Sequence, residues 1–144
     1  MQKTLHKKRI FHRISIETLW HAITDSHQLE EWFMETNFQS KENLAFEFFD
    51  APGEKWKGLY HGEILSSQPP INLAYSWCHK KLKHTTYVWW KLEVKGQDTI
   101  LEVEHSGFKG IQDYFSSFYY SRFWNDKLKN LLVYVTQMQD KVEI

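Results

Sequence analysis

SIETLWHAITDSHQLEEWF, residues 15–33, carries the start signals of two consecutive helices. Ser15 is a favoured N-cap residue and stands directly before an apolar-periodic segment. Asp25, followed three residues later by Gln28, has the pattern of a capping box and marks the start of a second, short helix. The sequence therefore predicts a helix over residues 14–25 and a short helix directly after it.

The first helix presents one apolar stripe, and the second ends in two large aromatic residues. Four residues of the first helix follow the spacing i, i+3, i+4, i+7 of a single helical face: Ile16, Leu19, Trp20 and Ile23. At the end of the stretch we expect Trp32 to pack inward beside a long C-terminal helix, whereas Glu30 and Glu31 face water. We therefore predict that this segment belongs mainly to the core and only secondarily to the rim of a pocket.

The middle of the chain alternates apolar and polar residues with the period of β-strands. The predicted strands are 44–49, 59–65, 72–77, 87–94 and 99–105. The residues expected on their apolar face are Phe46, Phe48, Leu73, Tyr75, Trp77, Val88, Trp90, Leu92, Val94, Leu101 and Val103. One polar and one apolar face are typical of an antiparallel sheet. The basic segment 3–13 is predicted to be a further strand with a solvated face.

The end of the chain, residues 112–139, is predicted to be one long helix. Its apolar stripe consists of Tyr120, Trp124, Leu128, Leu131, Val135 and Met138, which face the sheet. Either Ser116 or Ser117 can cap it, so its start is left open. The order of strand, two helices, five strands and long helix predicts an α+β domain with its helices on one face of the sheet. The space between helix and sheet is a usual place for a small-molecule site.

Composition restricts the functional classes. The 144 residues suit a single domain, 1–144, and the 18 basic and 18 acidic side chains balance. That balance argues against non-specific binding to nucleic acid or to an anionic membrane. One cysteine, Cys78, fits a reducing compartment, and no apolar run is long enough to span a membrane. We expect a cytoplasmic protein.

Three segments resemble the family of homologues of the activator of heat-shock protein 90 ATPase. They are SIETLWHAITDSHQLEEWF (15–33), GEILSSQPPINLAYSW (62–77) and LEVEHSGF (101–108), in the family's order. The resemblance covers about residues 10 to 135. It implies the helix-grip fold of the START-like, or Bet v 1-like, superfamily, in which a curved antiparallel sheet wraps around a long C-terminal helix. Many such domains hold a hydrophobic ligand.

The resemblance leaves the function open, because the superfamily contains lipid carriers, cyclases and aromatases, and co-chaperones. Eukaryotic co-chaperones of the family carry a large additional N-terminal domain that does much of the chaperone binding. Because this chain starts almost directly at the helix-grip domain, we do not expect a chaperone partner. Homodimers are common in the superfamily, and the sequence is compatible with one.

Ten side chains, nine of them aromatic rings and one a histidine, are predicted to line a ligand site. They are Trp32, Phe46, Phe48, Tyr60, Tyr75, Trp77, Trp90, His105, Tyr120 and Trp124. Buried tyrosine hydroxyls need hydrogen-bond partners, which favours an amphipathic ligand over a pure hydrocarbon. The competing interpretation is that the rings fill the space themselves, since protein interiors are close-packed.

The sequence does not require catalysis. His105 follows the apolar phase of its strand, so it is either a core histidine with satisfied nitrogens or a group that contacts a ligand. Glu63 is expected to face solvent, and Cys78 is opposite in phase to Trp77. The histidines show no metal-binding spacing. We therefore expect no metal, no cofactor and no catalytic residue.

Three functions remain. The first is a non-enzymatic binding domain for a small hydrophobic or amphipathic molecule. The second is an enzyme of the cyclase or hydrolase kind that uses the same cavity, with His105 or a tyrosine positioning the substrate. The third is a protein-interaction module that uses the outer sheet face or the basic first strand. The lack of an acid–base pair favours the first, whereas a filled interior favours the third.

Overall fold

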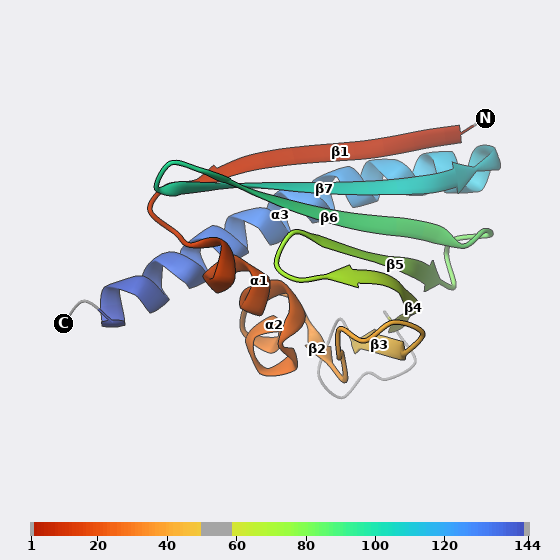
Figure 1. The fold of residues 1–144 in the computed structure, drawn as a ribbon. Helices are drawn as coiled ribbons and strands as arrows, with labels where there is room; N and C mark the ends of the chain where they lie inside the picture. Colours follow the sequence, from red (N-terminus) through yellow and green to blue (C-terminus); the bar gives the residue numbers. More distant parts are fainter. Residues whose placement is uncertain (1, 50–58, 143–144) are drawn as a thin grey trace.

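The computed structural model describes residues 2–49 and 59–142, and within them a seven-stranded antiparallel sheet lies beside one long helix (Figure 1). The elements are β1 (Gln2–Phe11), α1 (Ile16–Thr24), α2 (Ser26–Trp32), β2 (Glu35–Thr36), β3 (Ala45–Phe49), β4 (Leu59–Gln68), β5 (Asn72–His79), β6 (Thr86–Lys95), β7 (Asp98–Lys109) and α3 (Gly110–Val142). The strand order is β1-β7-β6-β5-β4-β3-β2. Every neighbouring pair is antiparallel, so the predicted α+β fold is confirmed.

The two short helices start where their capping residues predict. The Ser15 side chain accepts a hydrogen bond from the backbone N–H of Thr18 at 3.1 Å, and Asp25 accepts one from the N–H of Gln28 at the same distance. Ser15 itself has extended backbone angles, so α1 begins one residue later, at Ile16. These side chains satisfy N–H groups that have no partner within the helix.

The predicted strand faces are confirmed with one exception. Tyr75, Trp77 and Trp90 are buried, whereas Glu63 is exposed. Val94 was predicted to be buried but is 56% exposed. It pairs with Thr99 beside the β6–β7 turn. The alternation therefore continues past the part of β6 that other elements cover, and the prediction for this residue was wrong.

The long helix starts earlier than predicted. α3 begins at Gly110, directly after β7, and both Ser116 and Ser117 lie inside it. Gly110 has φ +77°, a conformation that glycine adopts without strain, and this lets the chain turn from strand to helix without a loop. Five of the six stripe residues, Tyr120, Trp124, Leu128, Leu131 and Val135, are buried. Met138, near the end of the helix, is only partly covered.

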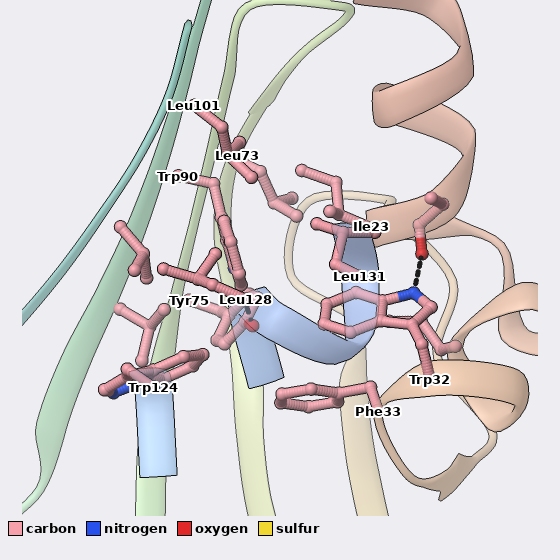
Figure 2. Packing of buried hydrophobic residues seen from close by; sticks show 14 of the residues in the cluster. Ile23, Trp32, Phe33, Leu73, Tyr75, Trp90, Leu101, Trp124, Leu128 and Leu131 are labelled. Carbon is pink, nitrogen blue, oxygen red and sulfur yellow. Dashed lines mark hydrogen bonds between the residues drawn. The ribbon is translucent and has the colours of Figure 1, made fainter. Parts of the chain in front are cut away.

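Aromatic side chains dominate the space between α3 and the sheet, and α1 and α2 close it on one side (Figure 2). Trp32 is 4% exposed and points into this space, and its indole N–H donates to the carbonyl of Ala22 at 2.8 Å. Glu30 and Glu31 are exposed. The predicted orientation of this segment is confirmed.

Candidate functional site

All ten side chains predicted to line a ligand site are buried, and none is more than 4% exposed. They come from seven elements, and Trp77 on β5 lies at their centre. Its ring centroid is 4.9 Å from that of Tyr60 and 5.9 Å from those of both His105 and Trp124. Trp90 connects the cluster to Trp32, with centroids 6.5 Å apart. The structure thus brings the ten side chains together, and their role as ligand contacts stays a prediction.

Three phenylalanines that were not predicted belong to the same cluster. Phe33 is stacked on Trp124 with centroids 6.0 Å apart, and it meets Phe48 edge-on at 4.9 Å. Phe38 is stacked on Phe48, and Phe123 meets Trp124 edge-on. Phe33 is the C-cap of α2 and Phe38 follows β2, so neither lies in a periodic pattern. For Phe123, helical spacing was a usable signal, because it lies three residues after Tyr120 of the buried stripe.

His105 lies in a chain of hydrogen bonds that fixes its tautomer. Tryptophan can only donate, so the Trp124 indole N–H donates to Nδ1 of His105, at 3.0 Å. The Thr86 hydroxyl donates its one hydrogen to the Trp77 carbonyl at 2.8 Å. Nε2 of His105, 2.7 Å from the Thr86 oxygen, must then carry the proton and donate. His105 is therefore a neutral imidazole with both nitrogens engaged.

The surroundings of His105 agree with this neutral state. Burial, which penalises the charged imidazolium, lowers its pKa from the usual 6.5 to about 3. A ligand in the interior can touch the ring carbons of His105, but it can bond a nitrogen only by displacing Trp124 or Thr86. Thr86 was not predicted, because it stands one residue before the expected start of its strand.

The Tyr75 hydroxyl is a buried polar group that is only partly satisfied. Its hydroxyl oxygen accepts from the Trp90 indole N–H at 2.9 Å, and the side chain is 2% exposed. Within residues 2–49 and 59–142 it forms no hydrogen bond as a donor. Burial raises the pKa of Tyr75 well above 10, with the Trp90 hydrogen bond offsetting this only in part. The hydroxyl therefore keeps its hydrogen.

A hollow of about 400 Å³ lies at the surface, where β5 ends and β6 begins. Its lining residues are Leu59, His61, Cys78, His79, Lys80, Leu82, Lys83, His84 and Thr85. Cys78 thus faces away from Trp77, as predicted, and its thiol lies 3.5 Å from the Thr85 hydroxyl. Among the residues that the structure describes, no three histidine, cysteine, aspartate or glutamate side chains are placed to hold a metal ion.

Asp113 connects the rim of this hollow to the first turn of α3. Its carboxylate accepts from the backbone N–H of Lys83 at 2.8 Å, lies 2.9 Å from Nδ1 of His84, and accepts from the N–H of Lys109 at 3.4 Å. Burial by itself raises the pKa of Asp113, but these hydrogen bonds and the charge of His84 together bring it below the usual value. No local sequence pattern indicates this group, because its partners lie up to 30 residues away along the chain.

A curved antiparallel sheet around a long C-terminal helix, with two short helices after the first strand and an aromatic interior, defines a helix-grip domain of the START-like superfamily. The sequence model of the family described as Activator of Hsp90 ATPase homolog 1-like protein matches residues 13–135. The chain belongs to this family, as its sequence motifs predicted.

Solved structures agree with this fold. MLL2253 from Mesorhizobium loti superposes with a TM-score of 0.81 at 26% identity, over 94% of this chain and 98% of that chain. CalU16 from Micromonospora echinospora gives 0.78 at 21% identity, over 98% and 81%. PFC0360w, an HSP90 activator from Plasmodium falciparum, gives 0.74 at 17% identity, over 92% and 96%. No curated protein sequence matches this chain significantly. Within the described residues, no helix combines the length and apolar character needed to cross a membrane.

Proposed function

We propose that this chain is a binding domain for a small amphipathic molecule, held between α3 and the inner face of the sheet. The Tyr75 hydroxyl carries the proposal. It is a buried donor that lacks an acceptor within the described residues, and such a group costs about 1–3 kcal/mol. An oxygen acceptor on a bound molecule would remove that cost.

The neighbours of Tyr75 define the rest of the ligand. The Phe46 ring lies 5.0 Å from that of Tyr75, Phe38 lies at 5.7 Å, and Trp77 is stacked at 6.4 Å. These walls favour a flat apolar body. An ionised group is expensive to bury without a charged partner, so the acceptor is expected to be a neutral carbonyl, ether or hydroxyl oxygen.

A binding role fits the hydrogen bonds of His105 better than a catalytic one. General-base catalysis needs a ring nitrogen that is free to take a proton near the working pH. Both nitrogens of His105 are engaged, and a pKa of about 3 keeps the imidazole a weak base. A cyclase or hydrolase that uses this residue would first have to open the contacts with Trp124 and Thr86.

The tight packing of the interior favours a small ligand. The rings of Phe33, Phe48 and Trp124 already touch one another. Phe33 is also held by two backbone hydrogen bonds, from its own N–H to the Leu29 carbonyl and from the Lys127 ammonium to its carbonyl, both at 2.7 Å. A ligand that reaches Tyr75 is therefore expected to displace side-chain rings rather than to shift the backbone at the end of α2.

Native mass spectrometry of the purified chain tests the proposal, with the denatured chain as reference. We expect an additional mass of a few hundred daltons that is lost on denaturation. Nile red, a neutral dye with a ring carbonyl, serves as a probe for the ligand-free chain, and its fluorescence should rise saturably. Tyr75→Phe should weaken the dye roughly fivefold, because one hydrogen bond is lost.

Tyr87→Phe is the matched control, because Tyr87 lies on the outer face of β6 and is 46% exposed. It should leave the binding of Nile red unchanged. A clean ligand-free mass together with no saturable dye fluorescence would lead us to abandon the proposal. Equal weakening by the two substitutions would remove Tyr75 from it.

A further inference from the structure

The first three turns of α3 carry a second apolar stripe, which is exposed. Ile111 is 71% exposed, Phe115 65%, Phe118 51% and Tyr119 53%. The rings of Phe115 and Phe118 are neighbours, with centroids 6.5 Å apart. All four residues lie within nine positions of one helix, at the spacing i, i+4, i+7, i+8 of one helical face. Single exposed apolar residues are ordinary, but a contiguous patch of large ones marks an interaction site.

Four lysines belong to the segments that meet at this stripe. The Lys3 ammonium lies 4.0 Å from the centre of the Phe118 ring. The carbonyl of Lys81 accepts from the Gln112 side chain at 2.9 Å. The backbone N–H groups of Lys83 and Lys109 both donate to Asp113. The start of α3, the start of β1 and the β5–β6 connection therefore meet at one end of the molecule, far from the C-terminus (Figure 1).

The charged side chains at this end of the molecule are mainly positive. We call the four exposed side chains of α3 together with Lys3, Lys81, Lys83 and Lys109 the basic tip. Across residues 2–49 and 59–142, none of these four lysines forms an ion pair. Asp113, the acidic residue in the first turn of α3, is fully buried and already bonded to His84. The balanced total charge of the chain thus conceals a local cationic surface with an apolar centre.

We propose that the basic tip docks reversibly on an anionic phospholipid bilayer. Exposed aliphatic and aromatic side chains can enter the interface between headgroups and acyl chains, while lysines around them attract anionic headgroups. Neither component alone binds firmly, and the tip supplies both. This proposal rests on residues that the proposed ligand site does not use, so each proposal can fail without affecting the other.

The tip fits a bilayer better than a protein partner. Standard protein interfaces use about 20–30 residues on each side, and four exposed apolar side chains fall far short of that. A second copy that docked through the same surface would place the two sets of lysines against each other, because a twofold contact is self-complementary in position but not in charge. A bilayer accepts a small convex patch of this kind and neutralises its charge.

Vesicle flotation with the full chain tests the proposal. We expect the chain to float with vesicles of phosphatidylcholine and phosphatidylserine, to float much less with phosphatidylcholine alone, and to be released by salt. Ile111→Ser combined with Phe115→Ser should lower the partition coefficient roughly tenfold. Lys81→Gln and Lys83→Gln should each lower it roughly fivefold.

Matched controls lie on the distal half of α3. Leu132 and Val133 are 46% and 51% exposed, and Lys129 is an exposed lysine of the same helix. Leu132→Ser with Val133→Ser, and Lys129→Gln, should leave flotation unchanged. Failure of the native chain to float, or equal losses in the distal variants, would overturn the proposal. Salt-sensitive binding of a single-stranded oligonucleotide that is as tight as vesicle binding, or self-association that depends on Phe115 without flotation, would also overturn it.

Discussion

The indole N–H of Trp124 on α3 donates to Nδ1 of His105 on β7 at 3.0 Å. This contact is the start of a directed chain that continues through the Thr86 hydroxyl to the Trp77 carbonyl. It joins the long helix to the centre of the sheet through three side chains and ends at a backbone carbonyl. It also holds His105 as a neutral imidazole in one tautomer, because the Trp124 indole can only donate and the Thr86 hydroxyl already gives its one hydrogen to the Trp77 carbonyl.

Trp124→Phe should therefore lower the free energy of unfolding by more than the loss of buried apolar area alone would. The substitution leaves Nδ1 of His105 as a buried acceptor without a donor, which costs about 1–3 kcal/mol, and opens a small cavity besides. Urea unfolding should show a total loss of about 3 kcal/mol. Trp89→Phe is the control, since Trp89 is 40% exposed and bonds Asn72 at the surface. Its loss should stay below about 1 kcal/mol, and similar losses for the two would contradict this account.

The stability of the chain should fall on acidification because of His105. In the folded chain its pKa is about 3, whereas the unfolded value is 6.5, so only the unfolded chain takes up this proton between those values. The contribution is fully present above pH 6.5 and is lost as the pH falls toward 3. At pH 4 the loss amounts to about 3 kcal/mol, at 1.36 kcal/mol per pH unit.

His105→Gln checks this dependence, because glutamine does not titrate. Its unfolding free energy should be lower at neutral pH but flatter than that of the wild type between pH 6 and pH 4.5. Asp98, Glu102 and Asp113 also have lowered pKa values, and their contributions are lost as the pH falls below that window. His27→Gln, at an exposed position, should follow the wild-type curve. Parallel curves of unfolding free energy against pH for the wild type and His105→Gln would contradict the prediction.

Asp113→Asn should loosen the β5–β6 connection. The carboxylate accepts from Lys83 and Lys109 and faces His84, and an amide can reproduce only part of this pattern, because one of its two groups is a donor. We expect a loss of about 2 kcal/mol in unfolding free energy. Hydrogen exchange at the backbone amide of Lys83 should accelerate well beyond what Asp126→Asn, at an exposed position of α3, produces. Unchanged protection of Lys83 would argue against a structural role for Asp113.

Local sequence patterns predicted the fold, because the interactions that start a helix or orient a strand act between residues that are close in the sequence. The caps at Ser15 and Asp25 act within one helical turn, and the alternation that buries Trp77 and Trp90 repeats every second residue. Val94 shows the limit of this reasoning, since alternation does not indicate where the cover of a sheet ends. Likewise β2, a strand of two residues, is too short to show a period.

The burial of the ten predicted side chains followed from the sequence, but their hydrogen bonds did not. Alternation placed Tyr75 and His105 inside, yet the partners of His105 come from a strand start and from a helix 19 residues along the chain. Which donor meets which acceptor depends on the register between elements, and no short sequence window contains that information. For the same reason the contact between Asp113 and His84 became visible only in the structure.

Gly62→Ala should be poorly tolerated. A Cβ at this position would collide with the backbone carbonyl oxygen of Ser76 and would lie 2.8 Å from Cζ of Phe46. Backbone cannot yield as a flexible side chain can, so β4 would have to move away from β5. We expect a loss of about 3 kcal/mol or more in thermal or urea unfolding. Gly96→Asn is the control, because Gly96 has open space around it and asparagine tolerates its φ of +63°. A Gly62→Ala variant as stable as the control would contradict the packing described for this strand pair.

Tyr75→Phe should have almost no effect on the stability of the ligand-free chain, although it removes a buried hydrogen bond. In the wild type the Tyr75 hydroxyl hydrogen has no acceptor within the described residues. In the variant the Trp90 indole N–H loses its acceptor instead. One unsatisfied buried donor replaces another, so the unfolding free energy should change by less than about 1 kcal/mol. Tyr120→Phe is the comparison, since its hydroxyl accepts from the Trp77 indole N–H at 3.2 Å, and its loss should cost about 1–2 kcal/mol. Urea unfolding of both variants after refolding without ligand makes the measurement. If Tyr75→Phe proved the more costly of the two, the hydroxyl would be better satisfied than its contacts indicate, and the acceptor expected of a ligand would not be needed.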